Sequence, residues 1–178
     1  LGNVGTPTAV AIKQVLADEK VPLFAPFTGA ASLRTPVNRY LLHYRASYNQ
    51  EVESFVAGMV DVLGNRKIAV FYQNDAYGMA VLEAAKAALK KRGLEPYVTG
   101  TYTRNFEDIY RAFEDIHDAK PQAVVMAGTY SACAKFILAW KRQYYLKGQP
   151  KDLNPVFMNV SFVGPDRLAF LLDKYGDN

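Results

Sequence analysis

KIAVFYQNDAYG, residues 67–78, decides the fold because it joins a buried strand directly to a helix. The stretch from Ile68 to Tyr72 is apolar, which is typical of a strand covered on both faces. The helix is expected to begin at about Tyr77, because apolar residues then recur at helical spacing up to Gly93. The polar residues between these elements need an explanation, since a tight Gly/Asp turn would suffice to join them.

The same strand-and-helix pattern recurs along the chain. Apolar runs predict further strands at 21–25, 96–102, 122–127 and 155–160, and a less regular one at 39–45. Helices are predicted over 47–64 from a Ser-x-x-Gln capping box, from an Asn105 cap, through Cys133 and from Pro165. Apolar strands that alternate with amphipathic helices indicate a parallel sheet covered on both faces. The predicted fold class is therefore α/β, with a doubly wound parallel sheet in three layers.

The composition is that of a folded domain with a sizeable core. Half of the 178 residues are apolar and 21% are charged, which excludes a disordered chain. The net charge of +4 is mild, and the one tight basic cluster, Lys90–Arg92, falls at a predicted helix end, so no nucleic-acid surface is expected. Cys133 is the only cysteine and is predicted to be a small core residue. No apolar run approaches the about 20 residues that a membrane helix needs.

The residue patterns of known enzymes are not found in the sequence. There is no G-x-G-x-x-G, no Walker-type G-x-x-x-x-G-K and no G-x-S-x-G. His43 and His117 lie far apart, and Asp75 lacks the acidic neighbours that a magnesium site would want. We therefore predict no catalytic residue, no metal site and no cofactor. A flavodoxin-like enzyme, in which 5–8 would cradle a phosphate, stays open as an alternative.

The loops that follow the predicted strands are the places to look for a binding site. In open α/β sheets, ligands bind beyond the carboxyl ends of the strands. These loops supply hydroxyls, backbone amides and aromatic rings, at 5–8, 26–30, 73–77, 128–131 and 159–162. Thr6 precedes Pro7 at a predicted helix start, where unpaired amides attract anions. The simpler alternative is that Thr6 only caps its own helix.

Four segments carry a resemblance to a known family. VPLFAPFTGAASLR, YRASYNQEVE, KIAVFYQNDAYG and FMNVSFVGPDRL resemble, in order and spacing, the leucine/isoleucine/valine-binding type of solute-binding protein. These proteins are periplasmic receptors that serve ABC importers. The resemblance implies a type I periplasmic-binding-protein fold, with two α/β lobes that close on a small solute. Residues 1–46 would be part of lobe one, 47–163 lobe two, and 164–178 a truncated helix that continues lobe two.

The resemblance also assigns ligand-binding residues. Thr6 falls where the family holds the ligand carboxylate with a hydroxyl and nearby amides, and Thr8 lies in the same loop. Thr28 and Gly29 match a second lobe-one loop that contacts the polar head of the ligand. From lobe two, Tyr77 would close over the ligand and Tyr130 would face the cleft. The alternative for Tyr77 is that it only packs against the start of its own helix.

One position departs from the family pattern. Amino-acid binders of this type place an acidic residue after the strand that matches 156–160, where it pairs with the ligand's ammonium group. That position is Ser161 here, followed by Phe162. A serine cannot supply the charge-assisted bond that selects an ammonium. The ligand is therefore an amino acid bound differently, a carboxylate without an amine, or an aromatic or other small metabolite.

The resemblance implies a function without catalysis. The chain is expected to be the solute-binding component of an ABC importer, with a membrane permease as its partner and a periplasmic or other extracytoplasmic location. A sensor domain of a signalling receptor or regulator is the alternative. The chain resembles roughly the middle half of a family member. Because lobe one would be incomplete, strands such as 21–25 would lack neighbours, and we expect either a cleaved protein or pairing with another chain as a homodimer.

Overall fold

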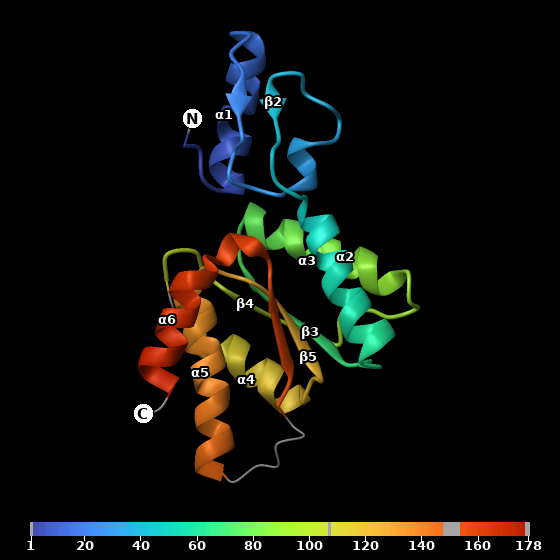
Figure 1. Ribbon diagram of the computed structural model, residues 1–178, viewed down its shortest axis with the longest axis vertical. Coiled ribbons are helices and arrows are strands. Elements are labelled where there is room, and N and C mark those ends of the chain that lie inside the picture. Colours follow the sequence, from blue (N-terminus) through green and yellow to red (C-terminus); the bar gives the residue numbers. More distant parts are fainter. Residues whose placement is uncertain (1, 107, 148–153, 177–178) are drawn as a thin grey trace.

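Two parallel β-sheets organise the chain (Figure 1). The computed structural model describes residues 2–106, 108–147 and 154–176. The smaller sheet pairs β1 (Leu23–Phe24) with β2 (Leu41–Leu42), next to helix α1 (Thr6–Asp18). The larger sheet has the strand order β4-β3-β5-β6, with all neighbours parallel; its strands are β3 (Ile68–Gln73), β4 (Val98–Tyr102), β5 (Ala123–Ala127) and β6 (Val156–Asn159).

Helices connect the strands of the larger sheet, as the sequence predicts. The main helices are α2 (Tyr48–Val56), α3 (Ala76–Lys90), α4 (Tyr110–Ala119), α5 (Tyr130–Lys147) and α6 (Pro165–Gly176). Short helical segments are η1 (Ala31–Leu33), the π-helix η2 (Ala57–Val62) that extends α2, and η4 (Ser161–Val163). Parallel strands joined by helical crossovers make a doubly wound α/β fold.

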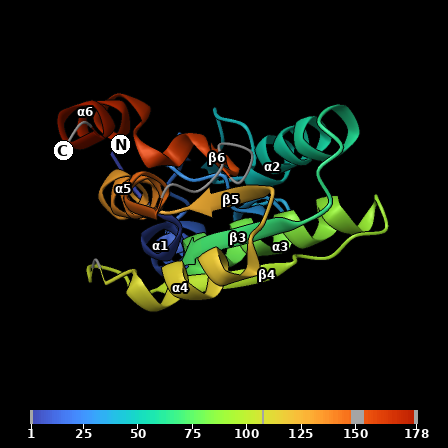
Figure 2. The ribbon, with the colours of Figure 1, turned by 90° about the horizontal axis from the view of Figure 1, so that it is seen from below.

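Strand β3 shows how the layers form. Ile68 and Val70 belong to the apolar cluster under α2 and α3, whereas Ala69 and Phe71 belong to the cluster under α4 and α5. This alternation follows from the two-residue period of a strand. All four side chains are buried, and burying a large apolar side chain contributes about 1.5–3 kcal/mol. Helices therefore cover both faces of the sheet (Figure 2).

The capping box after residue 46 is confirmed. The backbone N–H of Gln50 donates to Ser47 Oγ at 3.2 Å, and that of Ser47 donates to Gln50 Oε1 at 2.9 Å. Gly64 follows the helical segment with a φ of 71°, the left-handed conformation expected of a glycine at this place.

Some predicted boundaries are wrong. The strand expected over 39–45 is reduced to β2, and α4 begins at Tyr110 instead of directly after Asn105. Asn105 has a φ of 65°, a left-handed conformation that asparagine tolerates but that a helix cap does not use. Phe106, expected on the buried face of that helix, is exposed.

The basic cluster at the end of α3 makes ion pairs. Arg92 Nη1 lies 2.9 Å from Glu53 Oε1 and Arg92 Nη2 lies 2.8 Å from Asp61 Oδ2, while Lys91 Nζ lies 3.0 Å from Glu53 Oε2. These contacts tie the end of α3 to α2 and η2. Their contribution to stability is small, because the carboxylates lie at the surface, where solvent screens the charges.

Gly78 provides a test of how α3 packs on β3. A Cβ at Gly78 would lie 1.9 Å from the carbonyl oxygen of Gln73, so Gly78→Ala must push the helix start away from the strand. We expect a loss of about 2–3 kcal/mol or more in the free energy of unfolding, measured with urea. Gly58→Ala is the control, because no atom lies within 4 Å of a Cβ at Gly58. It should be neutral or gain about 0.5–1 kcal/mol. Equal changes in the free energy of unfolding for Gly78→Ala and Gly58→Ala would contradict the close packing of α3 on β3.

Candidate functional site

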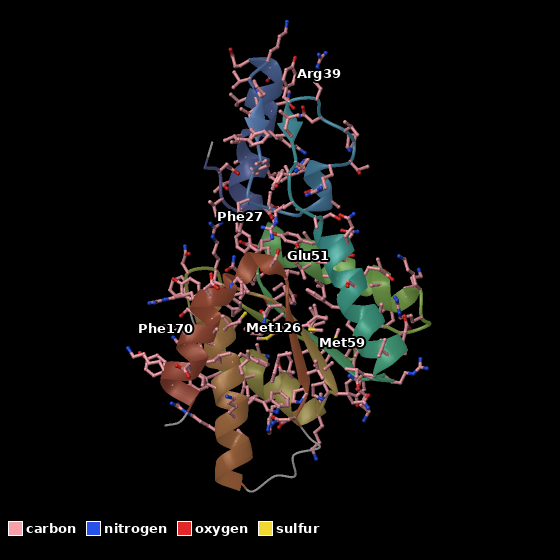
Figure 3. All side chains as sticks on the ribbon, viewed as in Figure 1. Phe27, Arg39, Glu51, Met59, Met126 and Phe170 are labelled. Carbon is pink, nitrogen blue, oxygen red and sulfur yellow. The ribbon has the colours of Figure 1, made fainter. Side chains whose placement is uncertain are left out.

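The part with β1 and β2 joins the part with the larger sheet at a junction (Figure 1). Side chains from both parts meet there. Figure 3 places Phe27 and Glu51 at this junction, one in each part. We call the residues that pack at its centre the junction cluster: Thr6, Thr28, Tyr48, Tyr77 and Phe162. The first four are buried, and Phe162 is half-buried.

The two threonine hydroxyls of the cluster bind each other. Thr6 Oγ1 and Thr28 Oγ1 lie 2.7 Å apart, and Thr28 Oγ1 also accepts a hydrogen bond from Ala30 N at 3.2 Å. The N-cap residue of α1 is Gly5, and no side chain within the described residues caps this helix. The alternative that Thr6 caps its own helix is therefore wrong. Its hydroxyl instead joins a second loop, 22 residues further along the chain.

Thr8 does not join the cluster. Its side chain is exposed, and its hydroxyl donates to the carbonyl oxygens of Val4 at 2.6 Å and Gly5 at 2.8 Å. These bonds stabilise the turn that leads into α1.

Gly29 allows Tyr48 to approach the loop closely. Tyr48 N donates to Gly29 O at 2.8 Å, and a Cβ at Gly29 would lie 2.7 Å from Tyr48 Cδ1. A side chain at position 29 would therefore displace the tyrosine. Sequence reasoning assigned Tyr48 only to the capping box and missed it as a site residue. The signal that could have found it is an aromatic residue at the first position of a helix that starts at this junction.

The Tyr48 hydroxyl is buried and has no partner at hydrogen-bond geometry in the part of the chain that the structure describes. Burial raises the pKa of Tyr48, and the nearby hydroxyl of Thr28 offsets part of that rise. Thr6 and the positive charge of Arg45 also act to lower this pKa. The Tyr48 hydroxyl therefore lies beside the threonine pair without bonding to it.

An aromatic column crosses the junction. The ring centroid of Tyr77 lies 4.5 Å from that of Phe162 and 5.5 Å from that of Tyr48, and Phe162 lies 5.3 Å from Phe27. The Tyr77 hydroxyl donates to Gly128 O at 3.4 Å, and burial raises the pKa of Tyr77 well above its usual value. Tyr77 thus contacts three other segments, at Tyr48, Gly128 and Phe162, and does not pack merely against the start of its own helix.

Ser161 takes part in a charged group beside this column. Its N–H donates to Glu51 Oε2 at 2.6 Å and its hydroxyl donates to Glu51 Oε1 at 3.0 Å. Arg45 Nη2 donates to Ser161 Oγ and lies 3.5 Å from Glu51 Oε1, and its guanidinium stacks over Phe27 at 4.4 Å from the ring centroid. Both oxygens of the Glu51 carboxylate therefore have partners in Ser161 or Arg45. Sequence reasoning missed Arg45 and Glu51, because their contacts join segments about 110 residues apart.

Tyr130 lies apart from the cluster at the start of α5. Its side chain is 41% exposed, and its ring lies 3.6 Å from where a Cβ at Gly164 would be.

The polar residues at the end of β3 form a hydrogen-bond network that fixes the start of α3. Asp75 Oδ1 accepts hydrogen bonds from Tyr77 N at 2.9 Å and from Gly78 N at 3.1 Å, and is thus the N-cap of α3. Gln73 Nε2 donates to Asp75 Oδ2 at 2.6 Å, and the Tyr102 hydroxyl donates to Gln73 Oε1 at 3.1 Å. Residues 73–75 are polar because they hold Tyr77 in place.

The features of a catalytic or metal site are not found among the described residues. No group of three or more His, Cys, Asp or Glu side chains could hold a metal ion there. Cys133 is buried as predicted, and burial raises the pKa of its thiol, so it is not an activated nucleophile. His43 Nε2 bonds with Leu33 O at 2.9 Å, and His117 packs on Phe113 and Trp140. The helices in the described ranges are all too short or too polar to cross a membrane.

Comparison with known proteins identifies the family. Residues 1–149 match the periplasmic binding protein family, which is well over half of the chain. The chain belongs to the periplasmic binding protein family. A possible leucine/isoleucine/valine-binding protein from Rhodopirellula baltica SH 1 is 35% identical with a TM-score of 0.82, over 96% of this chain and 45% of that one. This match confirms the type that the four sequence motifs predicted. No curated protein sequence matches the chain.

Two further solved structures share the fold of this periplasmic binding protein. A branched-chain amino acid ABC transporter protein from Thermus thermophilus with bound valine has a TM-score of 0.80 and 17% identity, over 97% of this chain and 43% of that one. A solute-binding protein from R. palustris in complex with benzoate has a TM-score of 0.74 and 17% identity, over 90% and 43%. The chain spans about 45% of the length of such proteins, so one of its two lobes is partial.

The Asp75 cap can be tested by mutation. Asp75→Ala removes the N-cap acceptor of α3 and leaves the Gln73 amide without its partner, so the free energy of unfolding should fall by about 1–2 kcal/mol. Asp75→Asn retains an oxygen for the helix amides and should lose less than half as much in the same urea titration. Equal losses for the two variants would show that Asp75 does not act as a cap.

Proposed function

We propose that this chain is the solute-binding component of an ABC importer and that it captures a small carboxylate-bearing solute between two lobes, without catalysis. The observation that carries the proposal is the buried Thr6–Thr28 hydroxyl pair beside the uncapped start of α1. Amides of a first helical turn have no acceptor within their own helix and attract anions. Two hydroxyl groups next to such amides make a site suited to a carboxylate.

The residues of the binding site are proposed from the packing. Thr6, Thr28 and the backbone around Gly29 would bind the polar end of the solute. Tyr77 and Phe162 would cover its apolar part, because their rings pack together at the junction with centroids 4.5 Å apart. We place Thr8, Tyr130 and Ser161 at the rim, since all three side chains are exposed.

The solute would be captured when two lobes close on it. We propose that 1–46 belong to lobe one, 47–163 to lobe two, and 164–178 to a helix that continues lobe two. Thr6 and Thr28 are fully buried in the present arrangement, so a solute reaches them only when the two parts separate. Hinge closure of this kind is common among ligand-capturing two-lobed proteins.

The partner and location follow from the family. The relatives described above are solute-binding proteins of ABC transporters or of the periplasm, so the proposed partner is a membrane permease and the proposed location is extracytoplasmic. The homodimer expected from the sequence has no support in these comparisons.

The test is a thermal-shift screen of the full-length protein against amino acids, short carboxylates and aromatic acids. A specific solute raises the melting temperature by mass action. Thr6→Val should lower the affinity for that solute at least about tenfold, because it removes one hydrogen bond to a charged group. Thr99→Val is the matched control, since Thr99 is exposed on β4. Stabilisation by no compound, or equal affinities of both variants, would contradict the proposal.

A further inference from the structure

Several buried polar atoms lack a partner in the described part of the chain, among them the acceptors Asn3 Oδ1 and Asn159 Oδ1 and three donors around the junction. The Tyr48 hydroxyl, Arg45 Nη1 and Arg34 Nε are all buried, and none has a hydrogen-bond partner in the described part of the chain. Arginine nitrogens can only donate, and a tyrosine hydroxyl is a ready donor. Buried polar groups are nearly always paired, so three unpaired donors in one region are a feature that needs an acceptor.

Hydrogen bonds join Arg34 to the segment that carries Arg45 and leads into Tyr48. Arg34 Nη2 donates to the carbonyl oxygens of Arg45 at 2.8 Å and Ala46 at 3.3 Å. The positive charge of Arg45 lowers the pKa of Arg34, after the larger effect of burial, and it also lowers the pKa of Tyr48. Both guanidinium groups therefore act on the surroundings of the Tyr48 hydroxyl.

The acidic groups nearby are already engaged. Glu51 accepts two hydrogen bonds from Ser161 and pairs with Arg45, and Asp75 caps α3 and binds Gln73. Arg34, Arg45 and Arg104 outnumber the acidic groups Glu51 and Asp75, so this region has a net positive charge; Arg104 Nη1 lies 3.7 Å from Asp75 Oδ2. The described carboxylates at the junction already have hydrogen-bonded or charged partners, and a further cation would be repelled by the arginines.

The helices that begin at the junction differ in how their first turns are capped. Ser47 and Asp75 cap α2 and α3 with their side chains, whereas α1 has no side-chain cap among the described residues. The uncapped start of α1 carries Thr6, whose hydroxyl bonds Thr28 next to Tyr48. The first turn of α1 adds backbone amides near the Thr6 hydroxyl, although Pro7 contributes none.

We propose that the junction selects organic acids that lack an ammonium group, with the Tyr48 hydroxyl as a specificity-determining donor to the carboxylate. This inference rests on the proposed function, because it names the solute class of the same site. An acid without an amine presents acceptors to Tyr48, Thr6 and Thr28. An amino acid would bring its ammonium next to two guanidinium groups with no free carboxylate to compensate.

Matched pairs of compounds that differ only in the amine test the inference. Calorimetric titration of the full-length protein at pH 7 would compare 4-methylpentanoate with leucine, 3-methylbutanoate with valine and 3-phenylpropanoate with phenylalanine. In at least one pair, the amine-free acid should bind at least about tenfold more tightly than its amino acid. An amino acid that binds as tightly as its amine-free partner, or more tightly, would overturn the inference and leave the proposed function standing. If no compound of the panel binds, the inference is also overturned, and the wider thermal-shift screen then decides the proposed function.

Tyr48→Phe separates a binding role from a structural one. Because the hydroxyl has no partner, its removal should leave the melting temperature without added acid unchanged, while the affinity for the acid falls about tenfold. Tyr97→Phe is the matched control, since Tyr97 is half-exposed and stacks with Lys67 away from the junction. An unchanged affinity of Tyr48→Phe would overturn the assignment of this residue.

Discussion

Parallel pairing of the strands around β3 is the constraint on which the rest of the structure depends. β3 pairs in parallel with β4 and β5, so that Gln73 lies opposite Tyr102 and Tyr72 lies opposite Ala127. The carboxyl ends of these strands, and the starts of the helices that follow them, must then lie at one edge of the sheet. Tyr77 of α3 and Phe162 of η4 meet for this reason, although 84 residues separate their positions in the sequence.

Burial and local hydrogen bonds make that edge rigid. Gln73, Asp75 and Tyr102 bind one another or the adjacent backbone, and Tyr102 OH also accepts a hydrogen bond from Thr129 N at 3.1 Å. Burial raises the pKa of Tyr102 to about 12, so its hydroxyl stays protonated and able to donate. The part with β1 and β2 contacts the part with the larger sheet through Phe27, which packs on Phe162, and through Gly29, whose carbonyl oxygen accepts a hydrogen bond from Tyr48 N. Separation of the two parts would break the contact between Phe27 and Phe162 without disturbing the larger sheet. The hydrogen bond between Thr6 and Thr28 would remain, because both threonines lie in the same part.

Much of the fold could be predicted from local patterns. The apolar run at 68–72, the Ser47 capping box and the glycine after η2 each act over a few residues, and the structure bears them out. The start of α4 could not be predicted, because Asn105 is equally suited to a cap and to the left-handed turn that it forms. At the site, hydroxyl and aromatic residues on loops pointed to Thr6, Thr28 and Tyr77. Arg45 and Glu51 could not be predicted because only long-range contacts reveal them, such as that between Glu51 and Ser161.

The most direct measurement of the central claim is a crystal structure of the full-length protein grown with its stabilising solute. The account predicts that a carboxylate oxygen of the solute lies at hydrogen-bond distance, about 2.5–3.2 Å, from the hydroxyls of Thr6 and Thr28, with the ring of Tyr77 over the solute. A solute bound elsewhere, with the two threonine hydroxyls still 2.7 Å apart and bonded to each other, would contradict it.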